Sequence, residues 1–204
     1  MDGEIGRRLI KVCESLNNML EMTFQGFRKS QETAIKEAEE IRKEIESYSS
    51  ELTQFLVKKS LSRDGGKEWV KAYLSIVSSF DRMRYNLDGI LDRLKKMVHD
   101  QVLFTDRAVK EVNDVFQETI NLLENLPDLI ITQNKLLAQQ MEEKGKSISG
   151  MADHYSEEHE QRLIEGVCVP QSSPLYLDIL FSLKGIIAHT VDISEKLIML
   201  SARV

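Results

Sequence analysis

The densest group of side chains able to bind a metal ion lies between residues 153 and 159. His154 and His159 stand there among the carboxylates of Asp153, Glu157 and Glu158. Imidazole nitrogens and carboxylate oxygens are ligands of divalent metals, and helical spacing brings several of them to one region. The same pattern is typical of a solvated helix face, which is the simpler interpretation. The stretch therefore supports only a hypothesis of adventitious metal binding.

A di-iron enzyme built on a helix bundle would carry Glu-x-x-His pairs, because that spacing points both ligands inward. The residues three positions before the four histidines are Lys96, Met151, Ser156 and Ile186. Since none of them is Glu, the sequence does not predict a di-iron oxidase.

The two cysteines, Cys13 and Cys168, are far apart and form no Cys-x-x-Cys motif, so neither a disulfide framework nor a zinc site is indicated. The sequence places no His or Asp to activate Cys168, and we interpret it as a small buried residue that packs a turn between helices. Gly65 and Gly66 lack the Lys-Ser or Lys-Thr pair of a phosphate-binding loop. We therefore predict neither catalytic nor cofactor-binding residues, and expect no enzyme.

The composition favours an all-α protein. The 204 residues are 42% hydrophobic and 29% charged, with only 10 Gly and 3 Pro to interrupt helices. The net charge of −6 argues against a nucleic-acid partner, because such proteins present a basic face to the phosphates. The N-terminal residues lack the apolar stretch of a signal peptide, and no run of about 18 apolar residues is evident. We therefore expect a cytoplasmic location.

Apolar residues recur at alternating gaps of three and four, which lays one apolar stripe along each of several helices. Pro127 should kink or end the fourth of them, and the glycines in residues 62–66 predict a reversal between the second and third. The segments with this pattern are residues 9–27, 34–55, 69–97, 109–123, 134–165 and a last one after Pro174. The fifth is the most polar, with predicted core contacts Leu137, Met141, Ile148, Met151, Tyr155 and Leu163.

The order short, long, long occurs twice along the chain. Residues 166–174 occupy in the second half the place that residues 62–66 occupy in the first, which suggests a duplication. Two antiparallel three-helix bundles, stacked side by side, would bury all the apolar stripes. We therefore predict an all-α fold of two tandem bundles, residues 1–104 and 105–204.

A longer motif lies near the C-terminus, where residues 159–193 read HEQRLIEGVCVPQSSPLYLDILFSLKGIIAHTVDI. This stretch resembles the signature of the PhoU-like domain of bacterial sodium/phosphate cotransporters. In that signature a His, an Arg-Leu, a Gly-x-Cys-x-Pro turn and a Leu-Asp-x-Leu precede Leu-Glu-Arg-Ile-x-Asp-His. Residues 80–83, Phe-Asp-Arg-Met, resemble the same Leu-Glu-Arg-Ile core. The matching residues are His159, Arg162, Leu163, Gly166, Cys168, Pro170, Leu177, Asp178, Leu180, Leu183, His189 and Ile193.

The resemblance implies positions for a metal cluster of iron or zinc. In metal-binding PhoU proteins an acidic residue and an Asp four positions later lie on one face of the third helix of each bundle. The first copy here keeps Asp81 but has Tyr85, and the second copy has Lys184 and Ala188. Because three of the four positions differ, a cluster is not expected, and Asp81 and His189 remain as the candidate metal ligands.

The resemblance also implies a six-helix PhoU-like fold and a non-enzymatic regulator of phosphate transport or signalling. Such a protein would dock its helical surface on the membrane domain of a phosphate transporter or on an associated sensor kinase. It would be cytoplasmic, or associated with the membrane as the soluble domain of a transporter. A structural helical adaptor without a phosphate role is the alternative, and a metal-binding bundle is the third hypothesis. A homodimer is also compatible with the sequence, because stripes within a bundle and stripes between chains look alike.

Overall fold

The computed structural model describes residues 3–61 and 67–201, and these residues form helices joined by short connections. The described part of the chain contains no strand, which confirms the all-α prediction. The reversal predicted within residues 62–66 lies outside the described residues. The helices are α1 (Gly3–Lys29), α2 (Glu32–Leu61), α3 (Lys67–His99), α4 (Asp106–Leu123), α5 (Leu126–Thr132), α6 (Lys135–Ile164) and α7 (Ser173–Ser201).

Capping side chains fix where several helices begin and end. The Thr105 hydroxyl accepts a hydrogen bond from the backbone N–H of Ala108 at the start of α4, at 3.2 Å. Asn134 begins α6 in the same way, accepting from the N–H of Leu136 at 2.9 Å. Such caps satisfy backbone donors that have no partner within the helix. Gly166 follows α6 with a φ of 73°, a left-handed conformation that glycine adopts without strain.

Two prolines lie in the first turns of helices, where a missing backbone N–H costs nothing. Pro127 is in the first turn of α5, so the disturbance predicted there is a break between α4 and α5. Pro174 is the second residue of α7, which therefore begins slightly earlier than the sequence predicted.

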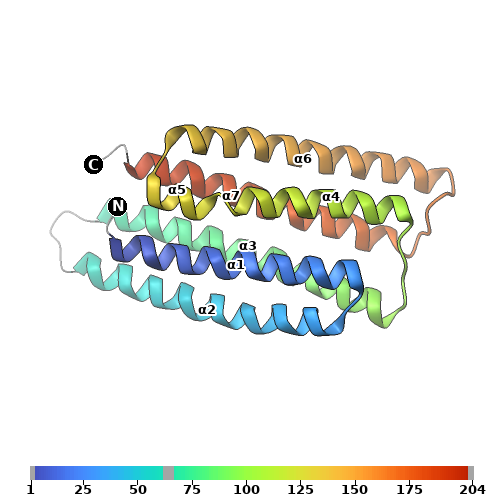
Figure 1. Ribbon diagram of the computed structural model, residues 1–204, viewed down its shortest axis with the longest axis horizontal. Coiled ribbons are helices and arrows are strands. Elements are labelled where there is room, and N and C mark those ends of the chain that lie inside the picture. Colours follow the sequence, from blue (N-terminus) through green and yellow to red (C-terminus); the bar gives the residue numbers. More distant parts are fainter. Residues whose placement is uncertain (1–2, 62–66, 202–204) are drawn as a thin grey trace.

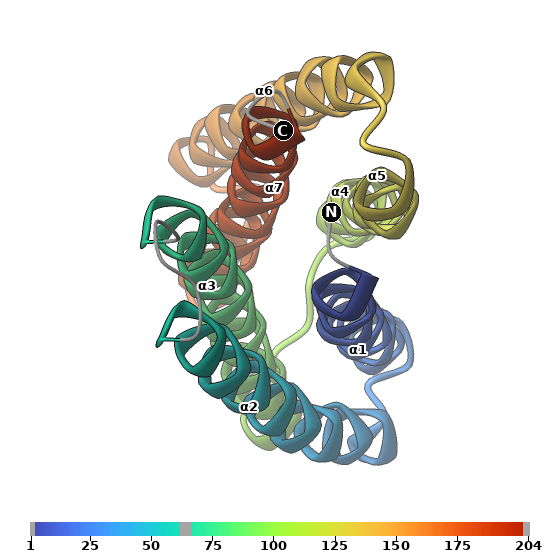
Figure 2. The same cartoon turned by 90° about the vertical axis from the view of Figure 1, so that its left-hand side faces the viewer.

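The helices run lengthwise, and each half of the chain forms a bundle of three rods in which α4 and α5 together make one rod (Figure 1). Figure 2 looks along the rods: α6, α7, α3 and α2 follow one another in a curved row, with α1 and the α4–α5 rod on its concave side. Contacts between α3 and α7 in one layer, and between α1 and both α4 and α5 in the other, join the halves. The boundary between residues 104 and 105 stays a prediction.

Helices α3 and α7, which carry the two related motifs, pack antiparallel with polar residues along one edge. The Ser79 hydroxyl donates to Asp192 at 2.6 Å, and farther along Arg93 donates to Asp178 at the same distance. Between these pairs Asn86 lies against Gly185, where a Cβ would approach the Asn86 side chain to 2.6 Å. The two halves therefore meet closely along this seam.

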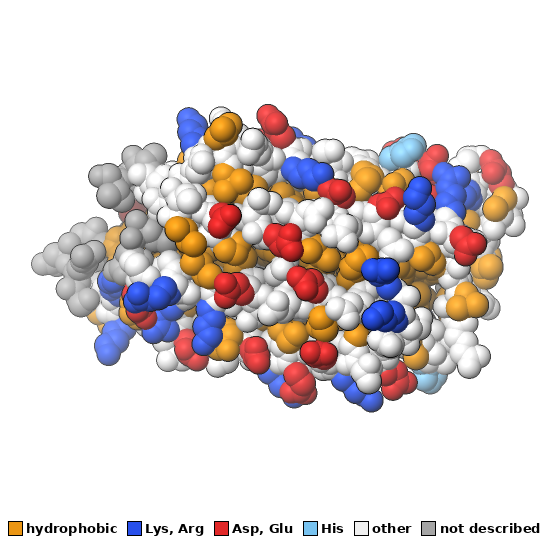
Figure 3. All heavy atoms as spheres, viewed as in Figure 1, with side chains coloured by type: hydrophobic (Ala, Val, Ile, Leu, Met, Phe, Trp, Pro, Cys, Tyr) orange, Lys and Arg blue, Asp and Glu red, His pale blue; other side chains and the backbone are white. Residues whose placement is uncertain are grey.

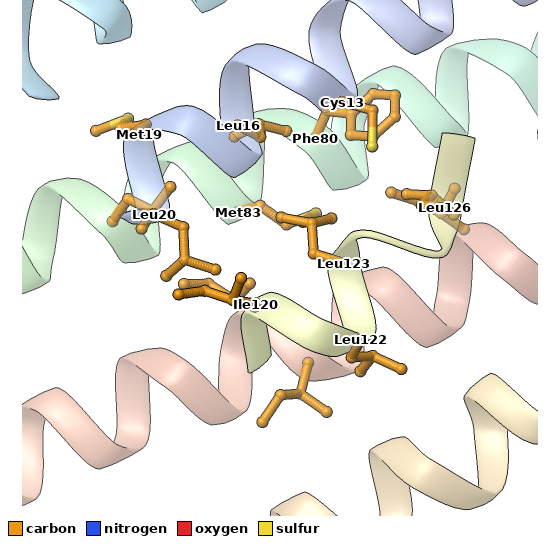
Figure 4. Close-up of a cluster of buried hydrophobic side chains, with 14 of the residues drawn as sticks. Cys13, Leu16, Met19, Leu20, Phe80, Met83, Ile120, Leu122, Leu123 and Leu126 are labelled. Atoms are coloured by element: carbon orange, nitrogen blue, oxygen red, sulfur yellow. The ribbon is translucent and has the colours of Figure 1, made fainter. Parts of the chain in front are cut away.

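One continuous apolar core runs through both halves. Phe116 of α4 stacks on Phe24 and Phe27 of α1, with ring centroids 5.0 and 5.9 Å apart. Figure 4 shows a second part of the core, around the point where α4 ends and α5 begins. The side chains labelled there come from α1, α3, α4 and α5, namely Cys13, Leu16, Met19, Leu20, Phe80, Met83, Ile120, Leu122, Leu123 and Leu126. The break after α4 thus turns leucines from both of its sides inward.

Helix α6 packs through small residues as well as large ones, which the sequence analysis did not predict. Met141 and Ile148 are buried as expected, but the other predicted contacts of α6 are only half-buried. Gly145 is buried instead, and a Cβ there would meet a methyl carbon of Val191 at 2.5 Å. Because α6 and α7 approach this closely, small side chains form the contact and larger neighbours lie beside it.

Helix α7 is the one described helix long and apolar enough, by length and composition, to span a membrane, with a mean hydropathy of 1.2 over its most apolar window. This corrects the expectation that no such segment exists. The helix lies against α3, α4 and α6, and 44% of that window is buried within the protein. Its apolar composition is accounted for by its place in the core.

Candidate functional site

A buried ion pair joins α4 to α6 at one end of the second bundle. The two terminal guanidinium nitrogens of Arg162, Nη1 and Nη2, donate to the two carboxylate oxygens of Glu111, at 3.0 and 2.7 Å. Arg107 and the Tyr176 hydroxyl donate to the same carboxylate at 2.9 and 2.6 Å. Burial alone would raise the pKa of Glu111, but the hydrogen bonds from Arg162, Tyr176 and Arg107 outweigh it and lower the pKa. Glu111 is therefore a buried, ionised and fully paired carboxylate.

His159 lies next to this ion pair, with Tyr176 stacked on its ring at a centroid distance of 4.3 Å. Its Nε2 is 2.9 Å from the Ser173 hydroxyl, and its Nδ1 is 3.9 Å from the Cys168 sulfur. Burial, together with the charge of Arg162, lowers the pKa of His159, so the neutral ring is favoured. The ring thus ties the end of α6 to the α6–α7 connection and to the start of α7.

This arrangement revises two interpretations of single residues. His159 is buried, with 1% of its surface exposed, so assigning it to a solvated helix face was wrong. Cys168 is buried as predicted, yet a histidine does lie beside its thiol, which the sequence did not reveal. Since neither group is accessible to a substrate, their chemistry here is structural: they hold the α6–α7 connection in place.

Four exposed apolar side chains lie on the outer side of this end. Leu103 and Ile164 are each more than four-fifths exposed, and Val167 and Val169 are more than half exposed. They lie in or next to the α3–α4 and α6–α7 connections, which share one end of the molecule (Figure 1). We call these four residues the apolar end. Exposed aliphatic side chains gathered on loops are a feature of contact surfaces.

The first predicted metal position, Asp81 with Tyr85, has a basic side chain next to it. Arg84 donates to Asp88 at 2.8 Å, lies 3.2 Å from Glu46 of α2 and is stacked over the Tyr85 ring. Asp81 is half-buried, and burial raises the pKa of its carboxyl against the nearby Ser49 and Arg84. The guanidinium therefore supplies positive charge to the carboxylates of this face.

The second predicted metal position likewise contains a basic side chain. Lys184 of α7 forms an ion pair with Asp153 of α6, the residue that the sequence grouped with His154. His154 is exposed on the surface beside Glu158. Within residues 3–61 and 67–201, no group of three or more His, Cys, Asp or Glu side chains is placed to hold a metal ion.

The remaining candidate, His189, lies apart from Asp81, in a hollow of about 360 Å³ between α3 and α7. Burial lowers the pKa of His189, and the charges of Arg82 and Lys196 add to this effect against the opposing charge of Asp192. The structure therefore does not bring the two candidate ligands together, and metal binding by either stays a prediction.

Comparison with solved structures shows the fold. PhoU from Pseudomonas aeruginosa superposes with a TM-score of 0.86 at 14% identity, covering 98% of this chain and 97% of that one. The phosphate transport system regulatory protein PhoU from Streptococcus pneumoniae gives 0.84 at 14% identity, covering 98% and 95%. A PhoU-like protein from Shewanella oneidensis gives 0.63 at 11% identity, covering 98% and 100%. The chain therefore has the PhoU fold over its described length.

Comparison of the sequence alone, unlike comparison of the structure, finds no match. No family model matches it, and no curated protein matches it.

Proposed function

We propose that this protein is a regulator of phosphate transport or phosphate signalling that acts by binding another protein. The observation that carries the proposal is the PhoU fold, shared with two PhoU structures over nearly the whole length of each chain. The signature residues His159, Arg162 and Cys168 support it, because all three lie together in the structure. Fold alone does not determine function, so the proposal depends on these residues and on the experiment below.

The apolar end is the contact surface that we propose. The ion pair of Glu111 with Arg162 and the hydrogen bond of His159 with Ser173 hold the α6–α7 connection in one conformation. A surface that is ordered before binding loses less conformational entropy on docking. On the face seen in Figure 3, acidic and basic side chains are interspersed, without a large patch of one sign. We therefore propose docking through apolar contacts on the cytoplasmic side of a membrane transporter or its sensor kinase.

The experiment is a pull-down of the tagged chain from native membranes at high and low phosphate. We expect recovery of a transporter subunit or a sensor kinase, in amounts that change with phosphate. Val167→Glu and Val169→Glu together should abolish the recovery, because a charge in an apolar contact is costly to desolvate. Leu136→Glu is the matched control, since Leu136 is equally apolar and exposed but lies at the start of α6, at the opposite end. Absence of any transporter or kinase at both phosphate levels would contradict the proposal.

The more specific part of this proposal is that the chain is a regulatory domain of a sodium/phosphate cotransporter. An immunoblot of fractionated cells tests it, because a large membrane-bound polypeptide indicates a regulatory domain joined to a transporter. A band near 23.4 kDa in the soluble fraction indicates a free-standing regulator instead.

A structural adaptor without a phosphate role is the second candidate. The observation that favours it is that Tyr85, Lys184 and Ala188 stand at three of the four predicted metal positions, and that Lys184 pairs with Asp153. Recovery of the same partner in equal amounts at both phosphate levels would support the adaptor over the regulator.

A further inference from the structure

The hollow between α3 and α7 gathers polar side chains from both halves of the chain. Helix α3 supplies Ser75, Ser78, Ser79 and Arg82, whose spacing places them on one helical face. Helix α7 supplies His189, Asp192 and Lys196 from the opposite wall. The hollow therefore exists only where the two related helices pack together.

One acidic group in the hollow is already paired. Asp192 accepts hydrogen bonds from Ser79 at 2.6 Å and from Lys196 at 2.5 Å. Burial would raise the pKa of Asp192, but these two partners outweigh it, so the carboxylate stays ionised. With Lys196 it forms a neutral pair, although the second oxygen of the carboxylate can still accept a hydrogen bond.

The other polar groups of the hollow are donors with capacity left. Arg82 has no ion-pair partner in the part of the chain that the structure describes, and its charge is the second cause of the lowered pKa of His189. Ser75 and Ser78 add hydroxyl groups, and His189 adds a ring nitrogen that can donate. Counting Arg82, Lys196 and Asp192, the hollow carries net positive charge in a chain whose total charge is −6.

These groups suit an anion and not a cation. A metal ion would find two ligands, His189 and Asp192, and would be repelled by Arg82 and Lys196. An oxyanion would instead meet a planar guanidinium, which binds two oxygens at once, and several hydroxyl groups. Asp192 adds selectivity, because a carboxylate can accept a hydrogen bond only from an oxyanion that still carries a proton.

We propose that the α3–α7 hollow binds a small proton-bearing oxyanion of the inorganic phosphate type, with Arg82 as its main anchor and Asp192 as the acceptor of its proton. The inference goes beyond the proposed function, since a regulator that acts by docking need not bind the anion itself. It also gives the two halves a shared ligand, because the anchor lies on α3 and the acceptor on α7.

Calorimetric titration of the full chain with inorganic phosphate, sulfate and chloride at equal ionic strength and neutral pH tests the proposal. We expect saturable binding of phosphate, weaker binding of sulfate and none of chloride. Arg82→Gln should weaken phosphate binding at least tenfold. Arg93→Gln is the matched control, because it removes the same charge from α3 at a residue paired with Asp178 outside the hollow. Its affinity for phosphate should stay within twofold of the wild type.

Two further variants complete the test without depending on Arg82. Ser78→Ala should weaken phosphate binding several-fold while the exposed helix face keeps its structure. Asp192→Asn should remove the preference for phosphate over sulfate. The proposal is overturned if phosphate does not bind saturably, if Arg82→Gln and Arg93→Gln lose affinity equally, or if Asp192→Asn leaves the preference unchanged. None of these outcomes depends on whether a transporter partner is found.

Discussion

Two polar clusters, one within the second half and one between the two halves, differ in how far water reaches them. The Glu111 carboxylate is 4% exposed and accepts hydrogen bonds from Arg162, Arg107 and Tyr176. In the α3–α7 hollow, Asp192 is half-exposed and Arg82 is a solvent-facing cation. A buried carboxylate that already accepts four hydrogen bonds has no capacity left for a ligand, whereas an open cluster with spare donors does.

The physical cost of disturbing the two clusters should differ accordingly. Removing one partner of a buried ion pair leaves the other charge without compensation in a medium where water does not reach it. Removing a charge at an open site lets water replace the lost interaction. The buried cluster should therefore control stability, and the hollow should control binding.

The largest effect is expected at Glu111. Glu111→Ala leaves Arg162 buried without its carboxylate and should lower the free energy of unfolding by about 3–5 kcal/mol. Urea denaturation monitored by circular dichroism measures it. Glu142→Ala is the control, because the ion pair that Glu142 forms among residues 3–61 and 67–201 is with the exposed Lys146 of α6, and its loss should cost at most about 1 kcal/mol. Similar losses in the two variants would remove the distinction between buried and open charges.

The next largest change in stability is expected at glycines where two helices pack closely. Gly145→Ala puts a methyl group against Val191 where α6 and α7 approach closely, and should cost about 1–3 kcal/mol in unfolding free energy. Gly150→Ala in the same helix meets nothing within 4 Å and should instead stabilise by about 0.5–1 kcal/mol. Gly185→Ala first meets the half-exposed Asn86 side chain, which can rotate away, and should fall between them. Thermal or urea unfolding of the three variants measures this order, and a stable Gly145→Ala protein would show that α6 can shift from α7.

The pH dependence of stability near neutral pH should be set by the lowered pKa values of His159 and His189. The pKa of His159 is lowered below its ordinary value of 6.5, so the unfolded chain binds a proton that the folded chain does not. The free energy of unfolding is therefore greatest above pH 6.5 and should fall as the pH drops toward the lowered pKa. His189 acts in the same direction, and Glu111 adds a further loss below its ordinary pKa of 4.5.

Urea titrations at pH 7.5 and 5.5 measure this loss. His159→Gln should make the difference between the two pH values smaller, even if the variant is less stable at both. His189→Gln should reduce the difference as well. A difference that neither substitution changes would mean that other groups titrate in this range.

The smallest effect on stability is expected in the hollow. Arg82→Gln should change the free energy of unfolding by no more than about 0.5 kcal/mol, because the side chain is exposed and has no carboxylate partner among residues 3–61 and 67–201. The same variant should lose phosphate affinity, so stability and binding separate at one residue. A loss of several kcal/mol would place Arg82 with the structural charges and not with the binding groups.

The helices could be predicted because their signals are local. Alternating apolar spacing indicated the segments, and Pro127 marked the break that separates α4 from α5. The packing of α6 could not be read in this way, since Gly145 is buried only because α7 approaches it closely. A pattern of large apolar residues contains no information about such an approach.

The candidate sites depend on distant partners and were mostly hidden. Glu111 and Arg162 are 51 positions apart, and nothing near Glu111 in the sequence marks it as buried. His159 lies in a polar stretch, yet both of its ring nitrogens face partners from the following connection and helix. The serines of α3 share one face with Arg82, but only α7 turns that face into a hollow. Resemblance identified His159, Arg162 and Cys168, and the structure adds Glu111, Ser173 and Tyr176.

The rate of phosphate uptake by cells tests whether this protein regulates phosphate transport. We would measure the rate of radiolabelled phosphate uptake in cells with and without this protein, after growth at high and at low phosphate. We expect wild-type cells to lower their uptake at high phosphate, and cells without the protein not to do so. Uptake that responds to phosphate equally in both kinds of cell would contradict a role in phosphate regulation.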